Sequence, residues 1–141
     1  MAHVRRQVRD RLIFKMKEIP EFKKVFNTSI FAIDKADLPA INIFTESDKL
    51  DENMGYIQVR NQTVSLSIHG EGGNVVDDLD ELLVLVEKKL QEDPTLDGVL
   101  KSLFFFKIES SFEDADSARG EIELSINCLY EIDERDPEIF L

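Results

Sequence analysis

Residues 121–130 read EIELSINCLY and alternate between polar and apolar side chains as far as Cys128. Successive side chains of a strand point to opposite faces of a sheet, so this segment has one apolar face and one polar face. We therefore expect an antiparallel strand with one face in the core and the other in solvent. The apolar set comprises Ile122, Leu124, Ile126, Cys128 and Tyr130.

The preceding strand segment, residues 101–110, carries apolar side chains on both faces. Phe104, Phe106 and Ile108 share one face, and Leu103 and Phe105 share the other. A strand that is apolar on both sides is typical of the middle of a sheet or of an interface. The sequence leaves both placements open.

Two further apolar runs lie near the start of the chain. A β-prone run covers residues 29–33, and residues 40–44 alternate directly after Pro39. Proline is tolerated at the first position of a strand, so we expect a strand there. The polar, acidic residues 45–55 that follow predict a long loop or an irregular hairpin.

The next strand segment changes parity along its length. Ile57 and Val59 occupy odd positions, whereas the later apolar residues occupy even ones. A shift of one residue moves side chains to the other face, so a bulge or turn is expected at residues 60–62. The even set comprises Val64, Leu66 and Ile68.

Two segments have the spacing of amphipathic helices. The first starts near Val4 and must end before Pro20, because the residue preceding a proline is pushed out of the helical region. The second starts after the N-cap candidate Asn74 and runs to about Gln91, following the strand-breaking glycines of residues 70–73. Their apolar stripes comprise Val4, Val8, Leu12, Ile13, Met16 and Ile19, and Val75, Leu79, Leu82, Leu83, Val86 and Leu90.

This order of elements lacks the strict strand–helix alternation of doubly wound folds. It predicts an α+β fold, with an antiparallel or mixed sheet of about four to five strands packed against two helices. A chain of 141 residues fits one domain over residues 1–141. The charged tail of residues 133–141 ends in apolar side chains, so we expect it to fray or to dock on a neighbour.

Charge is distributed unevenly along the chain. Residues 1–24 carry eight basic and three acidic side chains, a net charge of +5, whereas the remainder carries a net charge of −17. The overall charge of −12 argues against wrapping nucleic acid, because that affinity comes largely from neutralising phosphates. Two interpretations stay open: a solvated charged surface, or a basic edge that meets the acidic edge of an identical neighbour.

Compartment signals are few. No apolar run approaches the ~18 residues of a membrane helix, and the charged N-terminus lacks the apolar core of a signal peptide. A single cysteine, Cys128, cannot form an intrachain disulfide. We expect a soluble protein made in the cytoplasm, without a membrane partner.

Catalytic patterns are scarce. The two histidines, His3 and His69, and the apolar-face Cys128 do not suggest a Cys–His pair. Clustered zinc ligands, the EF-hand pattern and the glycine spacing of a nucleotide loop are all missing. The expectation is a protein that is not an enzyme and has no cofactor and no metal site.

Several segments together resemble the tail terminators of long-tailed phages, the family typified by the lambda minor tail protein U. The resemblance covers residues 4–132 and lies in the order of its pieces. The pieces are VRRQVRD (4–10), ADLPAINI (36–43), VSLSIHG (64–70), LDEL (79–82), DPTLDG (93–98) and the final Leu129-Tyr130.

The resemblance implies a structural protein of the virion tail. Copies would form a hexameric ring on the head-proximal end of the tail tube, stop tube growth and present a surface for head–tail joining. Its partners would be other copies of itself, the tail tube protein and the head–tail connector protein. DNA would pass through the lumen without sequence-specific binding, and acidic residues would keep the lumen non-adhesive.

Other readings remain. The chain is also compatible with another neck or head-completion protein, or with an acidic adaptor or inhibitor that occupies a basic partner. For subunit or partner contacts, the basic candidates are Arg5, Arg6 and Arg9. The acidic candidates are Glu46, Asp48, Asp51 and Glu52.

Overall fold

The structure is a computed structural model and describes residues 2–27, 33–113 and 118–141. Within these ranges the chain forms two α-helices, one short 3₁₀ helix and six strands. Their order is α1 (Val4–Lys17), β1 (Lys24–Phe26), η1 (Lys35–Asp37), β2 (Ala40–Met54), β3 (Ile57–Glu71), α2 (Val75–Glu92), β4 (Ser102–Phe112), β5 (Arg119–Asp133) and β6 (Asp136–Phe140).

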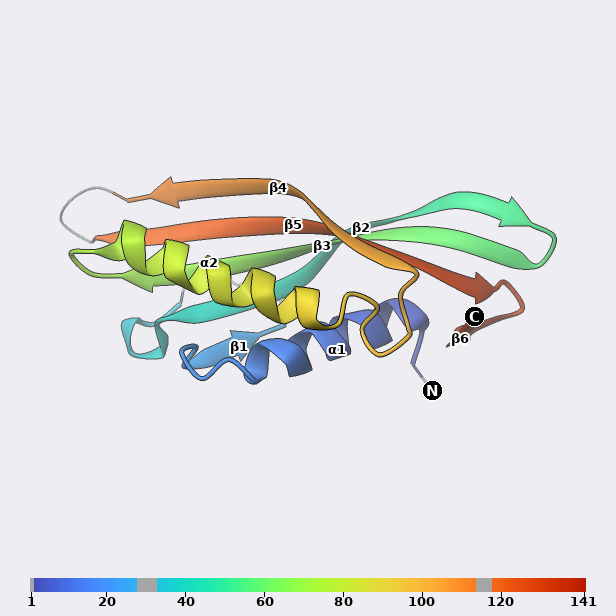
Figure 1. The fold of residues 1–141 in the computed structure, drawn as a ribbon, viewed down its shortest axis with the longest axis horizontal. Coiled ribbons are helices and arrows are strands. Elements are labelled where there is room, and N and C mark those ends of the chain that lie inside the picture. The colour runs from blue at the N-terminus through green and yellow to red at the C-terminus, as the bar shows by residue number, and fades with distance from the viewer. Residues whose placement is uncertain (1, 28–32, 114–117) are drawn as a thin grey trace.

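One mixed sheet holds all of these strands. Its order is β1-β2-β3-β5-β4, and β6 pairs with β5 at Ile132 and Asp133, beyond the first residue of β4. The β1–β2 pair is parallel, and the other pairs are antiparallel. The two helices cover one face of the curled sheet (Figure 1). The predicted α+β class is confirmed.

The core lies between the helices and the face of the sheet that they cover. Leu124 and Ile126 of β5, Leu66 of β3 and Leu79 of α2 are all fully buried there. Residues 121–130 keep the predicted alternation, since each even-numbered side chain from 122 to 132 is buried in this cluster. We call the opposite side of the sheet the open face.

Both helices form where the sequence predicts them. Buried side chains recur every four residues along α1, and Pro20 lies just beyond its end. Asn74 is the N-cap residue of α2, although its side chain makes no capping hydrogen bond. Gly72, with a φ of 127°, lies in the turn between β3 and α2. The two apolar stripes give each helix its position on the sheet.

The polar segment 45–55 is a hairpin rather than a loop. Strand β2 continues to Met54 and pairs with β3 along its whole length, with irregularities after Thr45 and after Leu50. Of the two expected forms, a long loop and an irregular hairpin, the hairpin is therefore confirmed. Beyond the helices, residues 49–57 extend past the rest of the body as a projecting arm (Figure 1).

The bulge expected at residues 60–62 is absent, and that prediction is wrong. Strand β3 stays in unbroken register with β5 from Ile57 to Glu71. The irregularities lie in the partner strand β2 instead. Ile57 and Val59 therefore face the side opposite Val64, where Val59 is buried and Ile57 is exposed.

Strand β4 lies at an edge of the sheet, so the central placement is wrong. An irregularity between Phe105 and Lys107 also separates side chains expected on one face. Phe104 pairs with Asn127 on the open face, whereas Ile108 pairs with Leu124 on the helix-covered face. The sequence also left open that this strand lies at an interface. That placement stays a prediction.

The remaining segments complete the body. Ile33, Leu38 and Ala40 form a second small buried cluster, with Phe26 packed against it. Most of the β-prone run at 29–33 lies outside the described residues. The C-terminal residues form strand β6, which pairs with β5 at Ile132 and Asp133.

Candidate interaction surfaces

A network of polar side chains joins the N-terminal half of α1 to the base of the arm. His3 caps the helix, because its Nδ1 accepts a hydrogen bond of 3.0 Å from the backbone N–H of Arg5. The side-chain amide of Gln7 donates to the carbonyl of Glu138, at 2.7 Å, just before the chain's end. The start of α1 is thus fixed both to the sheet and to the C-terminal strand.

Asp48 lies at the centre of this network. Its side chain is only 7% exposed, and the guanidinium of Arg5 lies 3.9 Å from its Oδ2 atom. The hydroxyl of Tyr130 donates a hydrogen bond to the same oxygen. The Oδ1 atom is buried and has no hydrogen-bond partner among the described residues. A buried carboxylate in this position depends strongly on the few donors that it has.

Two further links support the contact. The amide of Gln62 donates to the hydroxyl of Thr45 at 2.7 Å and to the carbonyl of Arg5 at 3.2 Å. The guanidinium of Arg9 donates to the same Thr45 hydroxyl at 3.3 Å. These contacts lie on the helix-covered face, where α1 meets β2 and β3.

Titration of this region is shaped by burial. Burial raises the pKa of the Tyr130 hydroxyl above its ordinary value, and the hydrogen bond to Asp48 adds to that effect. Burial lowers the pKa of His3, and the nearby Arg60 guanidinium lowers it further. Tyr130 therefore stays a neutral hydrogen-bond donor at neutral pH.

The predicted site residues separate into two groups. Arg5, Arg9 and Asp48 make contacts within the chain. Arg6 instead lies on the outer side of α1, where its side chain is 66% exposed and, among the described residues, pairs with Asp10 in the next turn, at 3.7 Å. The exposed acidic candidates are Asp51 and Glu52, in the arm, and Glu46.

Glu46 lies near charged neighbours of β4 and β5. Burial raises its pKa, and a hydrogen bond and charge repulsion from Glu123 raise it further. Lys107 opposes this effect, whereas Glu109 reinforces it. Among the described residues, Glu46, Glu109 and Glu123 thus form an acidic cluster around Lys107 on the open face near β4.

The arm exposes apolar as well as acidic side chains. Leu50, Met54 and Tyr56 are each more than half exposed. The Arg135 guanidinium lies 4.0 Å from the centre of the Tyr56 ring and covers part of it. Exposed apolar groups on a projecting hairpin are typical of a surface that contacts another molecule.

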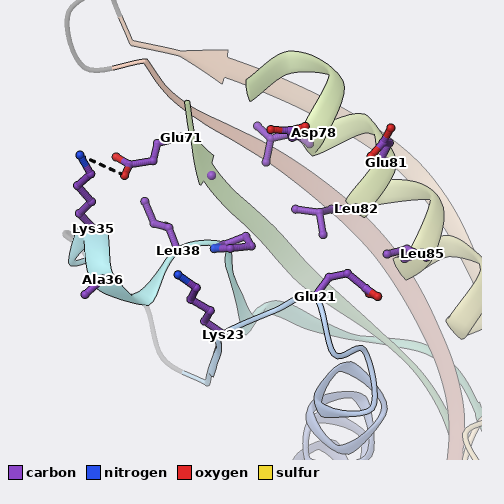
Figure 2. Close-up of a pocket in the computed structure, with 13 residues that line it drawn as sticks. Glu21, Lys23, Lys35, Ala36, Leu38, Glu71, Asp78, Glu81, Leu82 and Leu85 are labelled. Carbon is purple, nitrogen blue, oxygen red and sulfur yellow. Dashed lines mark ion pairs between the residues drawn. The ribbon is translucent and has the colours of Figure 1, made fainter. Parts of the chain in front are cut away.

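A groove of about 630 Å³ lies between α2 and the segment that leads into β2. Leu82 of α2 and Leu38 lie on opposite walls, and Lys35 pairs with Glu71 at 3.7 Å near one end (Figure 2). The sequence did not point to this groove, because its walls come from distant segments. Its described lining holds apolar side chains and both signs of charge, but neither histidine nor cysteine.

Reactive side chains are dispersed over the described ranges. Cys128 is buried, and burial raises the pKa of its thiol to about 12. Among residues 2–27, 33–113 and 118–141, no three histidine, cysteine or acidic side chains are grouped so as to hold a metal ion. Neither helix in these ranges has the length and apolar content needed to span a membrane.

No protein-family model matches the chain, and no curated protein sequence matches it. Among solved structures, it is similar to a chain described as "Virion of native gene transfer agent (GTA) particle". The sequences are 9% identical, 92% of each chain is covered, and the TM-score is 0.42. A similarity this low does not support an inference about function.

Proposed function

We propose that the protein is a virion structural protein that forms a hexameric ring on the head-proximal end of a tail tube. The ring ends tube growth and provides the surface for head–tail joining. The ordered series of segments that resemble tail terminators motivates the proposal. The projecting arm of residues 49–57 is the structural observation that carries it, because it exposes apolar side chains such as Leu50 and Met54 beside acidic ones.

A closed ring requires two different surfaces on each subunit. The arm supplies an acidic one, through Asp51 and Glu52, and the outer side of α1 supplies a basic one, through Arg6. Arg5, Arg9 and Asp48 are assigned a different role, because they hold α1 to the base of the arm. They position the two surfaces relative to each other without contacting the neighbour.

A charge-reversal series tests this interface. Arg6→Glu alone, and Asp51→Lys with Glu52→Lys, should each weaken assembly into rings, because each places like charges opposite one another. The combination of all three should recover assembly. Lys88→Glu is the matched control, because it makes the same charge change at an exposed position of α2. Full assembly by both reversed variants would overturn the proposed contact.

Binding to tail tubes tests the role itself. The chain would be added to growing tubes made from the tube protein of the same virus, and tube lengths would be measured by electron microscopy. A terminator binds one end and fixes tube length. Binding to the connector but not to tubes would instead favour a head-completion protein, and monomers that bind a basic partner would favour an acidic adaptor.

A further inference from the structure

The outer edge of β4 has unpaired backbone groups and exposed apolar side chains. Within the described ranges, β4 is the last strand on its side of the sheet, and β5 is the one strand that pairs with it. Phe104, Phe106, Ile108 and Phe112 are each between 43% and 49% exposed along this edge. Edge strands of soluble proteins are usually short, charged or covered, since a long apolar edge pairs readily with another strand.

The charges at the middle of β4 form a pattern that is complementary to itself. Lys107 and Glu109 flank Ile108, and both pair with residues of β5 whose side chains lie on the open face. If two such strands pair antiparallel about Ile108, each Lys107 lies opposite a Glu109. Opposite charges on directly facing residues stabilise antiparallel pairs, whereas like charges destabilise them.

The present surroundings of Glu109 favour the same arrangement. Glu109 lies directly opposite Glu123 of β5, a like-charged neighbour, and among the described residues its ion pair is with Lys107 of its own strand, at 3.0 Å. A lysine supplied by another strand on the free side would offset this repulsion. The two side chains are 53% and 62% exposed, so both can be reached by a partner.

We propose that β4 pairs antiparallel with β4 of a second copy of the chain. Ile108 lies on the two-fold axis, and each Lys107 faces Glu109 of the partner subunit. The two sheets then form one continuous sheet, and the two Ile108 side chains lie next to each other at the junction. This contact is isologous and lies at the edge of the sheet remote from α1 (Figure 1). It is therefore separate from the contact between Arg6 and the arm.

The test is sedimentation equilibrium of the full chain without magnesium, with Lys107→Glu and Glu109→Lys variants. Each single variant places two like-charged pairs in the junction and should raise the dimer dissociation constant about tenfold or more. Two recoveries are expected: the double variant should dimerise alone, and the two single variants should form a heterodimer when mixed. Lys88→Glu is again the control and should dimerise like the natural chain.

Three outcomes would overturn the proposal. These are a monomeric natural chain, single variants that dimerise normally, or a mixture of the two single variants that fails to associate. Circular dichroism of each variant checks that the fold is intact. The result is also independent of the ring. If magnesium-dependent rings form from the natural chain but not from Lys107→Glu, the β4 edge is a ring contact, and the two-fold pairing is refuted while the ring proposal stands.

Discussion

The hydroxyl of Tyr130 donates a hydrogen bond to Oδ2 of Asp48 and thereby joins β5 to the base of the arm across the intervening strand β3. Arg5 of α1 approaches the same oxygen atom. One buried carboxylate therefore connects the helix, the arm and the centre of the sheet. This relationship explains how a hairpin that leaves the core can still have a defined direction.

Tyr130→Phe should lower the free energy of unfolding by about 1–2 kcal/mol, because the buried carboxylate of Asp48 loses a donor without gaining another. Urea unfolding of the two chains measures the difference. Tyr56→Phe is the matched control, since Tyr56 is 56% exposed. This substitution should change the free energy of unfolding by close to zero. Equal effects of the two substitutions would show that the Tyr130 hydrogen bond contributes nothing specific.

Glu46→Gln should stabilise the protein at neutral pH. The folded state raises the pKa of Glu46, so ionisation opposes folding once the pH exceeds its unfolded-state value. The amide removes this cost at pH 7 and should raise the free energy of unfolding by a few tenths of a kcal/mol, because solvent screens the group. Below about pH 4 the carboxyl is protonated in both states, and no gain is expected. Thermal unfolding at several pH values measures it, with Glu52→Gln in the exposed arm as control. A gain that is the same at low and neutral pH would contradict the explanation.

Cys128 should be inert toward thiol reagents in the folded protein. Its side chain is fully buried, and its pKa of about 12 leaves almost no thiolate at pH 8. A colorimetric disulfide reagent should react with one thiol per chain in denaturing urea and with none in native buffer. Rapid labelling of the native chain would mean that β5 opens to solvent.

Gly120→Ala should destabilise the protein by about 1–3 kcal/mol. A Cβ atom at this position would lie 2.6 Å from the ring of Phe112 and 2.9 Å from the fully buried Leu79. Gly73→Ala is the control, because a Cβ there meets nothing within 4 Å. The Phe112→Ala background separates the two contacts. If the Phe112 ring moves aside freely, the destabilisation comes from Leu79, and Gly120→Ala should lower the free energy of unfolding by nearly the same amount with and without Phe112→Ala.

Sequence periodicity predicted the parts of the fold that pack against one continuous core. The strand at 121–130 and both helices have a single buried side, and each shows the corresponding spacing. The arm does not, because residues 49–54 lie outside the helical cover and are exposed on both faces. Their polar sequence therefore resembles that of a loop, although backbone pairing with β3 makes them a strand.

The candidate site shows the same limit. Net charge indicated that α1 and residues 46–52 matter for contacts, but it could not separate contacts within the chain from contacts between chains. Only the structure separates them. Asp48 is buried beside Arg5 of α1, whereas Asp51 and Glu52, at the second irregularity of β2, are exposed. The edge position of β4 could not be predicted either, because apolar side chains on both faces are also typical of a central strand.

The native mass of the full chain, measured over a range of protein concentrations with and without millimolar magnesium, tests the ring most directly. A subunit with a net charge of −12 repels its copies, and divalent cations screen that repulsion. If the ring forms, magnesium should promote species containing multiples of six copies, in the natural chain and in the Lys88→Glu control. Only monomers and dimers at every concentration, with or without magnesium, would contradict a self-assembling ring.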